Sequence, residues 1–326
     1  MPDYSVIIPT HNEGVQLILT VQSVIDTFMG GTDEPRQLEI IVVDDQSTDG
    51  SLEALALALK ASQPSSPRVS IHRGEERLGC SGAKRLGATK AEGDMLIFLD
   101  AHNRCGQDWL RHLEDGIARA GSADVGMFGP VMHSLTGDSS EMGEYWPTPE
   151  MKRSHMPHPT TDSPAPVLYI CGNGQAISRA VYDEVGGFDE GLLPPWGSED
   201  EELCLRLWRY GYQCVILPNW EMSSLYRSQF PYKVEYGVVL YNKLRLAWQH
   251  FDQPRIGSVL HHSLSQLERD TSGDDFSGYS MADKGKYLTD AINLVCNEEL
   301  FEVRRHHQER EKRTIDEIFK MFGMEW

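Results

Sequence analysis

The segment from Met95 to His102 combines a short apolar run with two residues of types that bind metal ions. A strand over Met95–Leu99 would carry a carboxylate, Asp100, and two residues later an imidazole, His102. The two point to the same side if the strand persists. Oxygen and imidazole nitrogen suit Mn²⁺ or a similar divalent ion, whose open positions would take diphosphate oxygens. The alternative is a strand-ending Asp beside a solvated His, and for this pair alone that alternative is favoured.

A second candidate group is acidic, because residues 199–202 read Glu-Asp-Glu-Glu before an apolar pattern with helical spacing. Between Val181 and Leu203 there are eight acidic residues and no Lys or Arg. Packed carboxylates raise one another's pKa, so one of them could accept a proton near neutral pH. A helix N-terminus also favours negative charge. By itself, the pattern is therefore more typical of an acidic first turn.

Two further motifs could hold a nucleotide. Asp44 and Asp45 follow an apolar run and precede a Gln-Ser-Thr-Asp sequence. A carboxylate here could accept the N3–H of uracil or the ribose hydroxyls, although helix capping is the alternative. The turn from Arg77 to Arg85 contains Gly79 and Lys84 and enters a predicted helix. It could bind an anion at the helix N-terminus, but a glycine-rich turn alone is weak evidence.

The elements that must position these residues alternate between strand and helix. Strands are expected at Tyr4–Ile8, Leu38–Val43, Val69–His72 and Met95–Leu99, and helices at Val15–Thr27, Ser51–Lys60 and Gly82–Lys90. This order predicts an α/β fold with a parallel sheet and right-handed crossovers. Ligands bind such sheets at the carboxyl ends of the strands. The candidate residues lie there, together with His11, Asn12 and Glu13.

The remainder of the chain is less regular. Residues 134–168 are rich in proline and loop-like, which is more typical of a lid or binding element than of filler. A helical pattern returns over Val234–Phe251, and Leu288–Val295 and Ile315–Phe322 show it too. These C-terminal helices could cover an acceptor, dock a partner or form a homodimer.

Composition excludes several classes of protein. The 326 residues are 40% hydrophobic and 24% charged, so the chain can bury a core. A net charge of -19 argues against nucleic-acid binding, although a metal ion could screen an anionic nucleotide. Apolar runs fall far short of the ~20 residues that span a bilayer, and no basic-then-apolar leader opens the chain. The six cysteines form no CxxC pair, so we expect reduced thiols in a cytoplasmic protein.

Taken together and in this order, the motifs resemble those of the GT-A nucleotide-diphospho-sugar transferases, specifically glycosyltransferase family 2 and its relatives, the polypeptide N-acetylgalactosaminyltransferases. The resemblance runs from about Tyr4 to Phe251. It is carried by Ser5–Glu13, Ile41–Asp49, Asp100–His102, Gly172–Ser178 with Gly186–Asp189, Trp196–Trp208 and Asn242–Trp248. It implies a Rossmann-like, mostly parallel sheet flanked by helices. Residues 1–228 would form the catalytic domain and residues 229–326 a mainly helical C-terminal extension.

The resemblance also implies roles for matching residues. Asp100 and His102 match the metal motif and would bind Mn²⁺, or Mg²⁺, against the diphosphate. Glu13 and Asp45 would hold the nucleoside, with Asp44 in support. Contacts to the donor are expected from Thr10, Glu13, Asp44, Asp45, Gly79, Lys84, Asp100 and Trp196.

Glu199 and Asp200 match the acidic pair that faces the donor sugar and the acceptor, and in inverting members this Asp is the catalytic base. The polypeptide N-acetylgalactosaminyltransferases carry Asn at that position and retain configuration, so Asp200 favours inversion. They also supply a His as third metal ligand where this chain has Ser224. The metal would then be held by two protein groups, diphosphate and water, or a His from elsewhere could substitute.

The function that the resemblance implies is metal-dependent transfer of a hexose from a nucleotide-diphospho-sugar, expected to be a UDP-sugar. The acceptor would be a hydroxyl of a saccharide, peptide or small molecule. Inversion with Asp200 as base is the expected course. The alternatives are a retaining, N-acetylgalactosaminyltransferase-like enzyme and a non-catalytic nucleotide-sugar-binding subunit. The sequence names neither the sugar nor the acceptor.

Overall fold

The computed structural model describes residues 3–28, 37–62, 67–137, 139–157, 161–227, 230–267 and 280–326. The strands are β1 (Tyr4–Thr10), β2 (Leu38–Asp44), β3 (Arg68–Arg73), β4 (Met95–Phe98), β5 (Asn103–Cys105), β6 (Val125–Ser134), β7 (Ser140–Glu141), β8 (Glu144–Tyr145), β9 (Ser154–His155), β10 (Ala165–Pro166), β11 (Gln175–Ser178) and β12 (Gln213–Ser224). The helices are α1 (Val15–Phe28), α2 (Ser51–Ser62), α3 (Gly79–Lys90), α4 (Trp109–Ala120), α5 (Arg179–Val185), α6 (Glu199–Arg209), α7 (Tyr236–His250), α8 (Gln253–Leu267), α9 (Met281–Val295), α10 (Glu298–Glu309) and α11 (Ile315–Met321).

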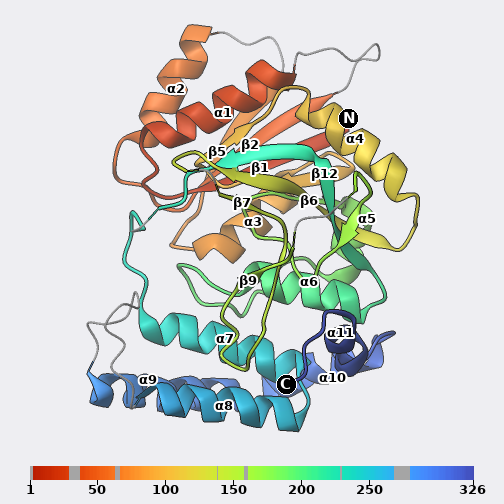
Figure 1. Ribbon diagram of the computed structural model, residues 1–326. Helices are drawn as coiled ribbons and strands as arrows, with labels where there is room; N and C mark the ends of the chain where they lie inside the picture. The colour runs from red at the N-terminus through yellow and green to blue at the C-terminus, as the bar shows by residue number, and fades with distance from the viewer. Residues whose placement is uncertain are drawn as a thin grey trace.

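Four parallel strands form the N-terminal half of the main sheet, in the order β3-β2-β1-β4. All seven residues of β2 are buried because helices cover both faces of the sheet. Residues of α1 and α4 join one hydrophobic cluster, and residues of α3, α6 and α7 join the other (Figure 1). The α/β order predicted for this half is confirmed.

The second half makes the sheet mixed. Strand β11 lies between β4 and β6 and runs antiparallel to both, with Ala176 opposite Ile97 and Phe128. Strand β12 pairs in parallel with β6, while β10 and β5 pair antiparallel with β12. The prediction of a mostly parallel sheet therefore holds, but sequence periodicity did not reveal the reversed strand β11.

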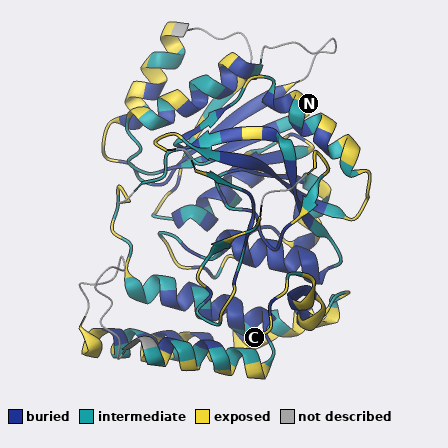
Figure 2. Ribbon diagram, in the orientation of Figure 1, coloured by how far each residue is buried: buried dark blue, intermediate teal, exposed yellow. Residues whose placement is uncertain are grey.

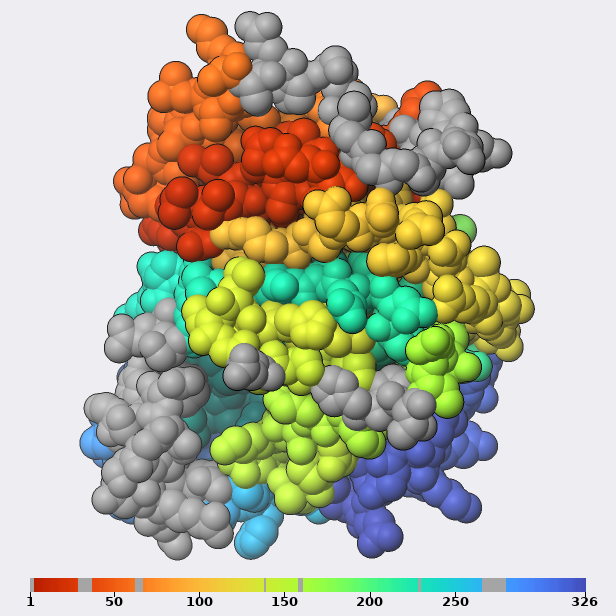
Figure 3. Space-filling model, turned by 45° about the horizontal axis from the view of Figure 1, so that its top comes forward, coloured from red at the N-terminus to blue at the C-terminus, as the bar shows by residue number. Residues whose placement is uncertain are grey.

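Two segments show detail that the sequence analysis left open. Strand β4 ends at Phe98, so Asp100 and His102 lie on a turn rather than on a continuing strand. The turn is closed by the Asn103 N–H, which donates to the Asp100 carbonyl over 3.2 Å. The segment 134–168 is mostly loop, as predicted, but short strands interrupt it. It contains β7 to β10, with 138 and 158–160 outside the described residues, and lies across the middle of one face (Figure 3).

The C-terminal helices form a layer below α6. Helix α7 lies against α9 and α10, and buried residues line the side of α7 that faces the rest of the protein (Figures 1 and 2). Within the described ranges, no helix has both the length and the apolar character needed to cross a bilayer. The predicted domain boundary at 228/229 lies outside the described residues and stays a prediction.

A buried network of hydrogen bonds joins the acidic helix to this layer. Glu202 of α6 accepts from His250 Nε2 over 2.9 Å, and His250 Nδ1 lies 3.1 Å from Arg209. His307 of α10 stacks on His250 with ring centroids 4.9 Å apart. Burial and the neighbouring arginines hold the pKa of His250 well below its ordinary value, so the ring stays neutral. These residue types could bind a metal, but here their polar atoms already serve in fixing α6.

We expect Arg245→Met to lower the free energy of unfolding by ~3–5 kcal/mol, since it leaves the carboxylate of Asp189 buried without its partner. In the wild type, Arg245 Nε and Nη2 lie 2.6 and 2.9 Å from the two oxygens of Asp189. Burial would raise the pKa of Asp189, but the pairing with Arg245 outweighs it and lowers the pKa. The pair therefore stabilises the fold at neutral pH, and this contribution is lost as the pH falls below the ordinary Asp range, ~4.

Urea unfolding at pH 7 measures this effect. The double variant Asp189→Asn/Arg245→Met is the matched control, because it removes both charges and should recover part of the loss. A single variant within ~1 kcal/mol of the wild type would show that the pair contributes little.

Candidate functional site

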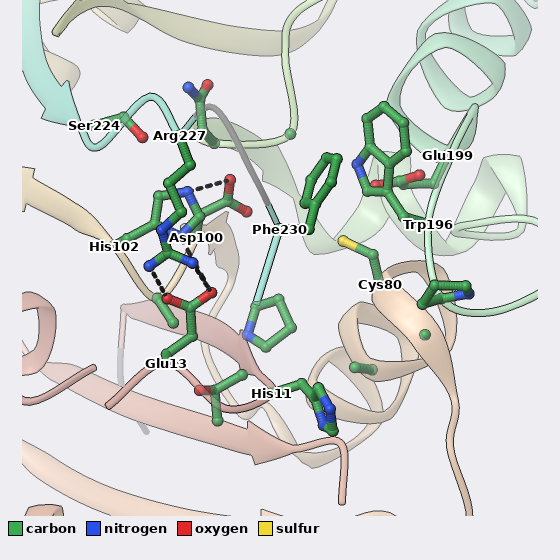
Figure 4. Close-up of a pocket in the computed structure, with 18 of the residues that line it drawn as sticks. His11, Glu13, Cys80, Asp100, His102, Trp196, Glu199, Ser224, Arg227 and Phe230 are labelled. Carbon is green, nitrogen blue, oxygen red and sulfur yellow. Dashed lines mark hydrogen bonds and ion pairs between the residues drawn. The ribbon is translucent and has the colours of Figure 1, made fainter. Parts of the chain in front are cut away.

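A cavity of about 370 Å³ lies where β1, β2 and β4 end. Every predicted site residue except Asp44 lines it. Figure 4 shows two groups around the cavity, with Phe230 between them. Asp100, His102, Glu13 and Arg227 form the first group, and Cys80, Trp196 and Glu199 belong to the second. Sites predicted from four separate motifs thus share one cavity.

The first group brings the predicted metal ligands together. His102 Nε2 lies 3.7 Å from Asp100 Oδ2, and the other ring nitrogen, Nδ1, lies 3.4 Å from Glu13 Oε1. Arg227 holds Glu13 through its two terminal guanidinium nitrogens, with Nη1 at 3.0 Å from Oε1. Ser224, at the end of β12, is buried beside them and also lines the cavity. Glu13 therefore contacts the corner of Asp100 and His102, and it lines the same cavity as Asp45, with which it is expected to hold a nucleoside.

Asp45 marks a separate corner. It accepts hydrogen bonds from the backbone N–H groups of Leu78 and Gly79 over 2.5 and 3.1 Å, and Arg77 Nε lies 3.2 Å away. Gly79 has φ +68°, and a Cβ there would lie 2.7 Å from the Cα of Pro194. The glycine thus allows the start of α3 to pack against the loop before Trp196.

Two other predicted donor contacts differ in their access to the cavity. Asp44 is buried, pairs with Arg73 over 2.9 Å and accepts from the Ser47 N–H. It is therefore placed to support the loop and not to touch a donor. Thr10 lines the cavity, and its hydroxyl has no hydrogen-bond partner among the described residues.

The acidic helix supplies the second group. Asp200 Oδ2 accepts from the Gly172 N–H over 2.7 Å, while Oδ1 is buried without a hydrogen-bond partner among the described residues. Glu199 Oε2 accepts from the Gly197 N–H, and its Oε1 lies 3.8 Å from Lys84 Nζ. Lys84 is fully buried and, in the described part of the chain, its ammonium has no hydrogen-bond partner.

The carboxylates of this helix do not titrate alike. Burial, followed by the charge of Asp200, raises the pKa of Glu199. Burial would also raise the pKa of Asp200, but Lys84, Arg153 and the Gly172 N–H outweigh it and lower the pKa. The expected mutual raising therefore holds for Glu199 and is wrong for Asp200, because cations and a backbone donor surround that side chain.

Glu201 should make the protein less stable above neutral pH. Burial raises its pKa to about 7, and Asp200 and Glu199 add to the shift against the opposing effect of Arg153. A carboxyl whose pKa is raised by folding contributes stability below its unfolded pKa, ~4.3, and loses it as the pH rises towards 7. We expect the wild type to lose stability between pH 5 and pH 8, and Glu201→Gln to lose less. Urea unfolding across this range measures the difference, and identical pH profiles would contradict the expectation.

Several cavity residues were not predicted as site residues. Arg153, from the loop between β8 and β9, lies 3.2 Å from Glu201 and over the ring of Trp196 at 5.3 Å. Phe230 packs on Trp196 and stacks on Tyr232, with centroids 5.3 and 5.5 Å apart. The proline-rich composition of the segment 134–168 was the only signal for Arg153, and no pattern marked Phe230 or Tyr232.

Known proteins that are similar in sequence to this chain are glycosyltransferases. A model of the family described as "Glycosyl transferase family 2" matches residues 5–186, and one described as "N-terminal domain of galactosyltransferase" matches residues 155–229. Polypeptide N-acetylgalactosaminyltransferase 10 of Rattus norvegicus is 32% identical over 262 residues, which are 75% of this chain and 41% of that protein. Polypeptide N-acetylgalactosaminyltransferase 15 of Homo sapiens is 31% identical over 267 residues, 76% of this chain and 39% of that protein. The chain thus spans about two fifths of the length of these relatives.

Solved structures share the fold. The crystal structure of GalNAc-T7 with UDP, GalNAc and Mn²⁺ superposes with a TM-score of 0.73 at 22% identity, covering 99% of this chain and 57% of that one. The structure of S. aureus TarS 1-349 in complex with UDP-GlcNAc gives a TM-score of 0.58 at 16% identity, covering 100% of this chain and 93% of that one. The expected GT-A architecture is confirmed.

Proposed function

Because the chain belongs to glycosyl transferase family 2, we propose that it transfers a hexose from a UDP-sugar to a hydroxyl acceptor, with a divalent metal ion as cofactor. The observation that supports this most strongly is the single cavity lined by Asp100, His102, Asp45 and Asp200. A metal corner, a nucleoside corner and a carboxylate facing the reacting atoms are the parts that such a reaction needs. Curated relatives named N-acetylgalactosaminyltransferases support the choice of donor class.

The residues present fit a metal ion. Asp100 Oδ2 and His102 Nε2 lie 3.7 Å apart, a separation that two bonds of ~2.0–2.2 Å can span. Oxygen with imidazole nitrogen is a donor set that Mn²⁺ accepts. When bound, the ion would offset the negative charge that develops on the departing diphosphate. With Ser224 in place of a third imidazole, the protein itself contributes few ligands, and the diphosphate and water would complete the set.

Lys84 could stabilise the departing diphosphate together with the metal ion. The ammonium of Lys84 is held beside Glu199 and Asp200 but makes no hydrogen bond to the described residues, so it can donate one to an anionic oxygen of the donor. The surrounding carboxylates outweigh burial and raise its pKa, so the group stays charged. Such a fixed, buried charge stabilises a leaving group without reorganising at the moment of reaction.

Asp200 is proposed as the base, with inversion of the anomeric centre. Its lowered pKa keeps it ionised at neutral pH, and Oδ1 has no hydrogen-bond partner in the described part of the chain, while Oδ2 is held by the Gly172 N–H. An acceptor hydroxyl can therefore donate its hydrogen bond to Oδ1 and transfer the proton as its oxygen attacks the sugar.

A retaining reaction is the second candidate, and the same pKa supports it. A carboxylate with a lowered pKa is a weak base but a good stabiliser of the positive charge that develops on the sugar. The named relatives are N-acetylgalactosaminyltransferases, and the resemblance implies retention for that group. NMR of the product anomer formed from an α-linked donor distinguishes the two outcomes.

A cytoplasmic location remains part of the proposal. The six cysteines are free thiols in the structure, as expected for a protein of a reducing compartment. Thiol titration of the denatured protein, purified without reductant from its native cells, should find six reactive groups. Fewer than six would favour an oxidising compartment.

The test of the proposed function is a panel of UDP-sugars, with GDP-mannose as nucleotide control, scored for release of the nucleoside diphosphate with Mn²⁺ and with EDTA. We expect release from one or more UDP-sugars that stops in EDTA. Binding without release, in the presence of candidate acceptors, would favour the non-catalytic subunit. The proposal would be overturned if the protein neither bound any of the UDP-sugars nor released a nucleoside diphosphate from them.

A further inference from the structure

Glu13 lies in an arrangement that its expected role at the nucleoside does not explain. Its side chain is 8% exposed, and the carboxylate lies between a guanidinium on one side and an imidazole on the other. Arg227 contacts both oxygens, and His102 Nδ1 lies 3.4 Å from Oε1 (Figure 4). Because Arg227 follows Glu13 by 214 residues, only the fold brings them together.

The two nitrogens of His102 face different groups. Nε2 faces Asp100 Oδ2 at 3.7 Å, on the side proposed for the metal, and Nδ1 faces Glu13. An imidazole that binds a metal through one nitrogen carries its proton on the other, and a carboxylate at that N–H fixes both the tautomer and the orientation of the ring. His102 Nδ1 is buried and makes no hydrogen bond to the described residues, and the Glu13 carboxylate 3.4 Å away is the acceptor that faces it.

The backbone around His102 is held by the segment that leads to Arg227. The His102 carbonyl accepts from the Leu225 N–H over 3.2 Å, and Asn103 pairs with Ser224 across β5 and β12. The chain then continues to Arg227, which holds Glu13. One short segment thus sets the position of the histidine backbone and of the carboxylate that faces its ring.

We propose that Glu13 is a positioning residue that orients His102 for the metal ion, with Arg227 holding the carboxylate in place. This inference rests on the metal site of the proposed function. Glu13 is not proposed as the missing third ligand, because it faces the nitrogen of His102 opposite to the one near Asp100. Both of its oxygens also contact a cation already. With Ser224 in the third position, the orientation of His102 should matter more than in a site with three protein ligands.

The experiment is a titration with MnCl₂ at fixed UDP, with free Mn²⁺ followed by electron paramagnetic resonance. Loss of a carboxylate behind a metal-binding histidine commonly costs 10–100-fold in metal affinity, so we expect Glu13→Ala to weaken Mn²⁺ binding by ~10–100-fold. Glu13→Gln keeps an oxygen that can accept from Nδ1, so its loss should be clearly smaller. Glu311→Ala is the matched control, because it also removes a carboxylate that pairs with an arginine. That arginine, Arg209, lies away from the cavity. Glu311→Ala should leave the Mn²⁺ affinity unchanged.

A double-mutant cycle with His102→Gln tests whether Glu13 acts through the imidazole. Once the ring is gone, Glu13→Ala should have almost no further effect on Mn²⁺ affinity. Pulsed electron paramagnetic resonance adds a direct signature, since nitrogen coupling from a coordinated imidazole should be present in the wild type and in Glu13→Gln and lost in Glu13→Ala.

The outcomes separate this inference from the function on which it rests. If the wild type binds no Mn²⁺, the metal part of the proposed function fails. If the wild type binds Mn²⁺ and Glu13→Ala keeps both the affinity and the nitrogen coupling, only the positioning role is overturned. Additive effects in the cycle, or equal losses for Glu13→Gln and Glu13→Ala, would also overturn it, because they indicate a direct ligand or a general charge effect. Should Glu13→Ala fail to fold, the same cycle is run with Glu13→Gln.

Discussion

Asp200→Asn is expected to lower the rate of sugar transfer by ~10²–10⁴, the usual loss when a general base is removed. The substitution is nearly isosteric, and the Asn oxygen can still accept from the Gly172 N–H that now binds Oδ2 over 2.7 Å. The local structure should therefore be kept, while the capacity to take a proton is lost. Steady-state kinetics with the donor found in the UDP-sugar panel measure the effect, and donor affinity should change little.

Glu201→Gln is the control for this prediction. Glu201 follows Asp200 on the same turn of α6, but it does not line the cavity, and its raised pKa leaves it partly neutral at pH 7. Its transfer rate should stay within a few-fold of the wild type. Similar turnover in Asp200→Asn and the wild type would remove Asp200 from the mechanism.

Asp100→Ala should abolish most of the dependence of donor binding on metal. The variant removes one of the two side chains proposed to hold the ion. Loss of a residue that only orients a metal ligand already costs ~10–100-fold in metal affinity. Loss of the ligand itself should therefore cost more than ~100-fold. Calorimetric titration with UDP measures the effect in Mn²⁺ and in EDTA. The wild type should bind more tightly with Mn²⁺, while the variant should bind equally weakly in both.

Adding a ligand to the metal site provides an internal check on this prediction. Ser224→His places an imidazole at the position where the resemblance expects a third ligand, and it should tighten Mn²⁺ binding if the ring fits the buried site. Asp115→Ala, on the exposed side of α4, is the control that should alter neither metal nor donor binding. Unchanged metal dependence in Asp100→Ala would place the ion elsewhere.

The sequence by itself determined where the chemically active residues come along the chain. The buried run of β2 predicted that Asp45 would stand at a carboxyl strand end, and the apolar run before Asp100 did the same for the metal motif. These inferences succeeded because the spacing of apolar residues directly reports which elements are buried, and parallel strands end at the same edge of a sheet. The order of the motifs along the chain was specific enough to indicate the family without any knowledge of the fold.

The tertiary structure decided how those residues act. Glu13 faces His102 because β1 and β4 are neighbouring parallel strands, and it is held by Arg227 because β12 returns along β6 and leads to that arginine. Asp200 has a lowered pKa because the Gly172 N–H, Lys84 and Arg153 converge on it from three distant segments. Periodicity describes only neighbours along the chain, whereas the charge state of a buried group depends on every dipole and ion packed around it in space. That is why the pKa of Asp200 is lowered, although packed carboxylates alone would raise it.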